Sequence, residues 1–148
     1  MKVVAIVLII VSIAVVLVIS VSAPEILSEN EFLKAFITHE ILTMVALIAT
    51  IAIALIATIH IWFNELEEKH QKRVFGRARR ELNQAGHTFV WLFLVQLLLL
   101  IIKSLSIFDK KPVAISLFNG LSLVILIAVI ITLVDVLGVA KALSPPED

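Results

Sequence analysis

The 148-residue sequence contains no cysteine. This absence excludes disulfide bonds, thiolate metal sites, iron–sulfur clusters and catalysis by a thiol. Glycine is scarce, with four residues in the chain, and no glycine-rich phosphate-binding loop is present. Charged residues make up 16% of the sequence, against about 25% in an ordinary soluble domain. The 12 basic and 12 acidic residues cancel, so net charge favours neither a nucleic acid nor anionic lipid as a partner.

Long apolar stretches occupy much of the chain instead. A bilayer core of about 30 Å is crossed by roughly 20 apolar residues in a helix. A soluble domain of this size has no interior large enough to hide several such segments. We therefore predict an all-α integral membrane protein, a single domain over residues 1–148 that forms a bundle of four transmembrane helices. The predicted spans are Val3–Val21, Ile41–Phe63, Phe89–Ile102, which can be extended to Phe108, and Val113–Val134.

The first apolar stretch has two properties of a signal peptide. Lys2 precedes it, and Val21-Ser22-Ala23 forms a small-residue cleavage pattern after it. The apolar run is nevertheless longer than the roughly 7–15 residues of a signal-peptide core. Pro24, directly after the pattern, is also unfavourable for cleavage. We therefore expect a retained first span.

The polar connections between the spans predict an orientation. With both termini in the cytoplasm, most basic residues lie on the cytoplasmic side, in agreement with the positive-inside rule. Trp62 and Trp91 both lie near predicted span ends on that same side, where interfacial aromatic residues gather. The expected location is the inner (plasma) membrane of a bacterium, with the N-in and C-in orientation.

The segment 64–86 is predicted to form a cytoplasmic helical hairpin between the second and third spans. Opposite charges four residues apart, such as Arg77 and Glu81, stabilise an isolated helix by roughly 0.2–0.5 kcal/mol per pair. Gly76 is a candidate turn, and Gly86 a candidate helix stop before the third span. The hairpin carries a basic surface: Lys69, Lys72, Arg73, Arg77, Arg79 and Arg80.

This basic surface has three possible roles. Retention of topology together with contact to anionic headgroups is the favoured interpretation. Docking of a cytosolic partner is the alternative. Nucleic-acid binding is not expected, because acidic residues interleave with the bases and Phe75 is the one aromatic residue beside them.

Small and polar residues recur along the second span at steps of mostly three or four positions. In lipid, small side chains permit close approach of two backbones and therefore mark helix–helix interfaces. We predict such an interface here. The alternative is the lining of a water or ion path, in which threonine hydroxyls would serve. The stripe consists of His39, Thr43, Ala46, Thr50, Ala54, Ala57 and Asn64.

Two uncharged polar residues interrupt the other spans. Gln96 lies within the third span, and Asn119 lies near the outer end of the fourth. Each is expected to form a hydrogen bond between helices, worth roughly 0.6–2 kcal/mol. The alternative is a constriction ring in an oligomer, with one such residue from each subunit facing the axis.

Asp135 lies near the cytoplasmic end of the fourth span. An ionisable group at this depth is costly and is usually paired. We expect an ion pair with His60, His87 or Arg77, all of which belong to the same side of the membrane. The alternative is a proton or cation site.

Two histidines on different spans are the minimum for a bis-histidine haem. His60 and His87 meet that minimum near the inner face, but their depth is interfacial and the outer face has no second histidine beside His39. Zinc could use His60, His87 and Asp135, although no close-spaced ligand pair supports such a site. No nucleophile with a matching base is found either. We therefore expect no cofactor, no metal and no enzymatic activity.

Together these patterns predict a small, non-enzymatic membrane protein, a homo-oligomeric pore-like or membrane-effector component. Its charged cytoplasmic hairpin would couple to a partner or signal. A protomer of this size has little room for an internal channel, so conduction would require an oligomer. Two alternatives remain: an accessory subunit of a larger membrane complex, and a histidine-ligated haem or metal membrane protein.

Overall fold

The computed structural model describes residues 2–71, 75–105 and 111–143. Within these ranges all regular secondary structure is helical, which confirms the predicted all-α class. Two short helices, α2 and α3, lie in the connection between the first two long helices. In chain order the helices are α1 (Lys2–Ser22), α2 (Glu25–Ser28), α3 (Glu31–Phe36), α4 (His39–His70), α5 (Gly76–Lys103) and α6 (Pro112–Leu143).

Among the described residues, four helices are long and apolar enough to cross a membrane: α1, α4, α5 and α6. This result confirms that each of the four predicted spans lies in a long apolar helix. The 32-residue helices α4 and α6 are each about 48 Å long at a rise of about 1.5 Å per residue. That length exceeds a bilayer core of about 30 Å, so both helices extend beyond it.

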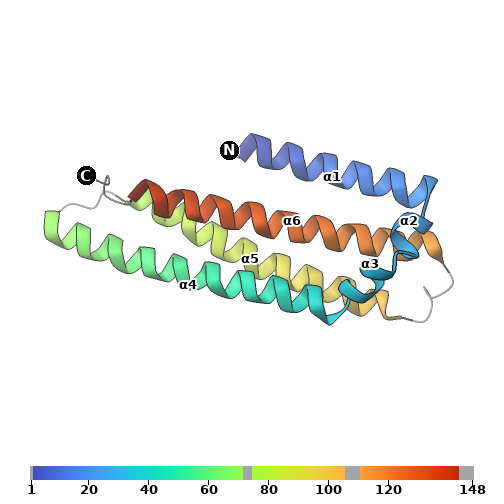
Figure 1. Cartoon of the computed structure of the whole chain (residues 1–148). Coiled ribbons are helices and arrows are strands. Elements are labelled where there is room, and N and C mark those ends of the chain that lie inside the picture. The colour runs from blue at the N-terminus through green and yellow to red at the C-terminus, as the bar shows by residue number, and fades with distance from the viewer. Residues whose placement is uncertain (1, 72–74, 106–110, 144–148) are drawn as a thin grey trace.

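The long helices α4, α5 and α6 lie side by side (Figure 1) and share one apolar core. Its α4 residues recur every three or four positions, which places them on one side of the helix. Phe63 on α4 and Phe89 on α5 are fully buried members of this core. The buried members of the core are Val45, Ala49, Ala52, Ile56, Ile59, Phe63, Leu82, Phe89, Ile125, Val129 and Val136.

Helix α1 packs mainly along α6 (Figure 1). Most of its apolar side chains are exposed. The contact depends on Gly120, because a Cβ atom added there would overlap Cγ1 of Val16. One turn away, Ser116 Oγ donates a hydrogen bond of 3.0 Å to Ser20 Oγ. The spacing of Ser116 and Gly120 is the small-xxx-small pattern that permits close helix approach in membranes. This pattern is visible in the sequence, but spacing alone does not indicate which helix it contacts.

The boundaries of α5 differ from two predictions. Gly86 does not stop the helix, which continues from Gly76 to Lys103. A glycine inside a helix costs about 1 kcal/mol relative to alanine, and the packing of α5 against α4 offsets this cost. The helix also ends at Lys103, so residues 104 and 105 do not continue it as predicted. The remainder of that predicted extension, residues 106–110, lies outside the described residues.

The turn between α4 and α5 begins at Gln71. This residue ends α4 in the left-handed conformation, with φ of 51°. Gly76 is the first residue of α5, close to the predicted break. At the other end of α5, Lys103 Nζ donates a hydrogen bond of 2.9 Å to the carbonyl oxygen of Ile37. This bond ties the segment before α4 to the end of α5.

Candidate functional site

The small and polar stripe of the second span lies on the outward side of α4, away from the shared core. Thr43, Thr50, Ala54 and Ala57 are exposed, whereas Ala46 is half-buried. We call these five residues, with His39, the α4 face. The structure therefore exposes the surface that the sequence analysis assigned to helix–helix contact. The contact itself stays a prediction.

The threonines of the α4 face use their hydroxyl hydrogens within their own helix. Thr43 Oγ1 donates to the carbonyl oxygen of His39 at 2.8 Å, and Thr50 Oγ1 donates to that of Ala46 at 2.8 Å. A hydroxyl that is already bonded can be covered by another helix without losing a partner. The geometry therefore suits a packed interface better than a water-lined path.

The ends of α4 and α5 nearest the turn are joined by a network around Arg79. Arg79 Nη2 donates to Asn64 Oδ1 at 2.8 Å and to Glu67 Oε2 at 3.0 Å. The other carboxylate oxygen of Glu67 accepts a hydrogen bond of 3.1 Å from the backbone N–H of Phe75. The Arg79 guanidinium also lies 5.5 Å from the ring centroid of Phe63, which stacks on Phe75 at 4.5 Å. We call this arrangement the hairpin network.

The predicted basic surface is therefore smaller than the sequence suggested. Arg79 is directed into the hairpin network, and its side chain is 26% exposed. Lys69, Arg77 and Arg80 are exposed, whereas Lys72 and Arg73 lie outside the described residues. Sequence reasoning missed the role of Arg79 because opposite charges twelve residues apart meet only after the two helices pack.

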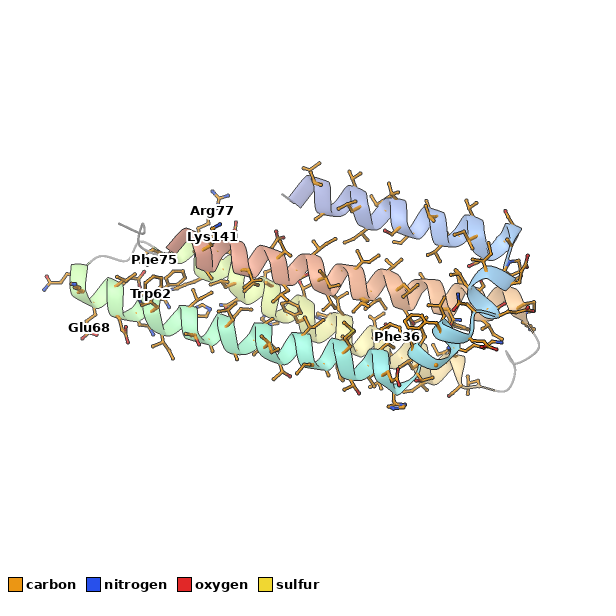
Figure 2. The ribbon with its side chains drawn as sticks, viewed as in Figure 1. Phe36, Trp62, Glu68, Phe75, Arg77 and Lys141 are labelled. Atoms are coloured by element: carbon orange, nitrogen blue, oxygen red, sulfur yellow. The ribbon has the colours of Figure 1, made fainter. Side chains whose placement is uncertain are left out.

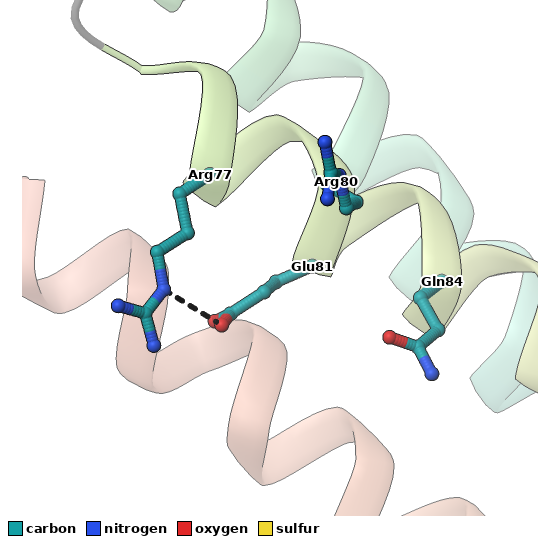
Figure 3. A pocket seen from close by; sticks show the side chains of 4 residues that line it. All are labelled: Arg77, Arg80, Glu81 and Gln84. Carbon is teal, nitrogen blue, oxygen red and sulfur yellow. Dashed lines mark hydrogen bonds and ion pairs between the residues drawn. The ribbon is translucent and has the colours of Figure 1, made fainter.

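An open concavity of about 470 Å³ lies on α5 beside this surface (Figure 3). It is lined by Arg77, Arg80, Glu81 and Gln84. Arg77 Nε donates to Glu81 Oε1 at 3.4 Å, one turn along the helix. The predicted pair of opposite charges is thus formed, although the Arg77 side chain remains 93% exposed.

His60 and His87 meet at Asn83 rather than at Asp135. His60 Nε2 and Asn83 Oδ1 lie 2.9 Å apart, and His87 Nδ1 and the Asn83 carbonyl oxygen lie 2.7 Å apart. The described part of the chain contains no group of three potential metal ligands. His60, His87 and Asp135 are therefore not brought together as one group of potential ligands.

Asp135 is half-buried on α6. In the described ranges it forms no ion pair with His60, His87 or Arg77, since His60 contacts Asn83 and Arg77 contacts Glu81. The predicted pairing is therefore wrong. The direction of a carboxylate depends on how far its helix is rotated, which spacing along one span does not reveal.

Gln96 and Asn119 are both fully buried inside the protomer. Asn119 Nδ2 donates a hydrogen bond of 2.6 Å to the carbonyl oxygen of Leu27 in α2. This bond confirms the predicted interhelical role for Asn119. Burial inside one protomer rules out the alternative that either side chain faces an oligomer axis.

Gln96 differs because both polar atoms of its amide lack a partner among the described residues. The Ser122 hydroxyl is likewise buried without a partner. Leu100, one turn from Gln96, and Leu123, next to Ser122, pack against one apolar cluster, so both polar residues lie at a similar depth. An unsatisfied buried group costs about 1–3 kcal/mol. The expected interhelical bond of Gln96 is not formed.

Comparisons with family models, curated proteins and solved structures give no match. Function is therefore inferred from the chain's own surfaces. The α4 face and the concavity on α5 are exposed, whereas the hairpin network joins α4 to α5.

Proposed function

We propose that this chain is a non-enzymatic membrane protein that assembles into a homo-oligomer through the α4 face and acts as a pore-like or membrane-effector component. The observation that carries the proposal is the outward direction of small and polar residues on α4. A surface that meets only lipid gains nothing from alanine and threonine, whereas these side chains allow two helices to approach closely. By contrast, the exposed side of α1 is mostly valine, isoleucine and leucine.

The packing of one protomer supports the oligomer rather than an internal channel. The core between α4, α5 and α6 is filled by aliphatic and aromatic side chains. A path for ions or water would therefore run between protomers. The bonded hydroxyls of Thr43 and Thr50 allow the α4 face to be buried without leaving a donor unpaired.

The hairpin network supports coupling between a cytoplasmic event and this interface. Asn64 and Glu67 belong to the same continuous helix as Thr50. A partner that displaces the start of α5 would therefore also move α4, because Arg79 is bonded to Asn64 and Glu67. Because α4 is unbroken from His39 to His70, such a displacement reaches the α4 face.

The mass of the purified protein in detergent tests the proposal. The unchanged chain is expected to be a homo-oligomer. Thr50→Leu is expected to shift the equilibrium toward the monomer, because the larger side chain at position 50 prevents close approach of two α4 faces. Val95→Leu is the control, because Val95 is exposed on α5 away from the α4 face. A monomeric unchanged chain would contradict the proposal and favour the accessory-subunit alternative.

Ion flux into liposomes tests the pore-like part separately. The oligomer is expected to conduct, and Thr50→Leu to reduce the flux in proportion to the lost oligomer. An intact oligomer without flux at any membrane potential would contradict conduction and leave the membrane-effector role.

A further inference from the structure

One outward surface of α5 joins basic residues to an apolar strip. Arg77, Arg80 and Gln84 lie at its hairpin end and are exposed. Trp91, Val95 and Leu98 continue on the same side at helical spacing, with exposed fractions of 66%, 42% and 56%. This surface is distinct from the α4 face, because it belongs to a different helix.

The concavity at the hairpin end offers cationic groups to a ligand (Figure 3). Arg77 uses its Nε atom for Glu81 and is otherwise exposed. Arg80 has no hydrogen-bond or ion-pair partner within the described residues. Two guanidinium groups against one carboxylate leave the lining with a net positive charge. Arginine favours phosphate because its planar group donates two parallel hydrogen bonds.

The start of α5 strengthens this positive field. The N-terminus of a helix carries a partial positive charge, so acidic residues stabilise its first turn and basic ones do not. The first turn of α5 contains Arg77 and no acidic residue. An anion bound near Arg77 and Arg80 would offset the repulsion between these arginines and the positive N-terminus of α5. Lys141 lies at the same end of the bundle (Figure 2) and adds a further positive charge.

We propose that this surface of α5 binds an anionic phospholipid. Arg77 and Arg80 hold the headgroup phosphate, with the Gln84 amide as a neutral donor beside it. The acyl chains lie along Trp91, Val95 and Leu98. This inference goes beyond the proposed oligomer and does not depend on it.

The apolar strip favours a lipid over a soluble phosphate. A soluble anion would make no use of the exposed Trp91, Val95 and Leu98.

Fluorescence quenching by brominated lipids tests the proposal. The chain has two tryptophans, so Trp62→Phe leaves Trp91 as the single reporter on the lipid surface. This parent protein is reconstituted in phosphatidylcholine vesicles containing a minor fraction of brominated phosphatidylglycerol or brominated phosphatidylcholine. Quenching is expected to show a preference for phosphatidylglycerol, with about a fivefold loss of that preference per arginine removed.

Three sets of substitutions are compared in the Trp62→Phe parent. Arg77→Gln with Arg80→Gln is expected to abolish the preference for the anionic lipid. Arg77→Lys with Arg80→Lys keeps the charge but loses paired hydrogen bonding, so an intermediate preference is expected. Lys34→Gln is the control, because Lys34 is exposed on α3, away from the hairpin end of α5; it is expected to keep the parent preference.

The outcome that overturns the proposal is equal quenching by the two brominated lipids in the parent. A preference that survives Arg77→Gln with Arg80→Gln overturns it as well. Far-UV circular dichroism verifies that each variant remains helical. Because the oligomer is measured by mass, failure of the lipid site and failure of the α4 interface give separate results.

Discussion

Gly120→Ala should separate α1 from α6. An added Cβ atom would overlap Val16 Cγ1 and lie 2.9 Å and 3.2 Å from Val16 Cγ2 and Cβ. A valine in a helix strongly prefers one rotamer, so the side chain cannot simply turn away. The helices must therefore move apart, which also stretches the bond between Ser116 and Ser20.

The free-energy cost of Gly120→Ala can be estimated from this contact, and Gly138→Ala is a matched control. Overpacking of this kind costs roughly 1–3 kcal/mol, and the stretched hydrogen bond adds about 1 kcal/mol. Gly138→Ala on the same helix meets nothing within 4 Å. Both substitutions replace glycine by alanine in a helix, which stabilises the helix by about 1 kcal/mol in each case. The difference in stability between the two variants therefore measures the clash with Val16 alone. The variants should differ by about 2–4 kcal/mol in the free energy of docking α1.

Two measurements check this prediction. Unfolding by sodium dodecyl sulfate in mixed micelles, followed by circular dichroism, compares the stability of the two variants. Ser20→Cys with Ser116→Cys then reports the contact itself, because the chain has no other cysteine and the parent hydroxyls are 3.0 Å apart. The disulfide should form readily with Gly138→Ala and poorly with Gly120→Ala. Equal stability and equal disulfide yield in the two backgrounds would refute the close approach of α1 to α6.

Further substitutions test the interior polar contacts by the same unfolding assay. Arg79→Ala should destabilise the fold by about 2 kcal/mol, because it removes charge-assisted hydrogen bonds of the hairpin network. Arg77→Ala, at an exposed position, should have little effect. Equal losses of stability in the two variants would contradict the role of Arg79 in the hairpin network. Gln96→Leu should raise stability by about 1 kcal/mol, because it removes an unpartnered buried amide; a marked loss would show that the amide is bonded. Asn119→Leu should lower stability by about 1 kcal/mol, because the Leu27 carbonyl loses its donor; unchanged stability would count against that bond.

Much of the fold could be predicted because membrane spans are encoded by length and hydropathy. The four apolar stretches gave four long helices, and the repeat on the second span correctly identified residues that share one side of α4. The Arg77–Glu81 pair was also predictable, because both residues lie on one helix. These features depend on local sequence alone.

Features that depend on helix rotation could not be predicted. Arg79 pairs with Glu67 because the two helices cross with those sides facing. Asp135, by contrast, does not meet the partners that depth alone suggested. Gly86 lies inside α5 because contacts with α4 outweigh the low helix propensity of glycine. Residue type and depth are therefore readable from the sequence, whereas facing direction requires the packed structure.

The central claim is that α4 faces of two copies meet in the membrane. Disulfide formation in the otherwise cysteine-free chain tests it directly, with Thr50→Cys and Ala57→Cys on the α4 face and Leu98→Cys on exposed α5 as the control. Oxidation in liposomes is expected to produce cross-linked dimers at positions 50 and 57 and not at position 98. Absence of cross-links at both α4 positions, or equal cross-linking at position 98, would contradict assembly through the α4 face.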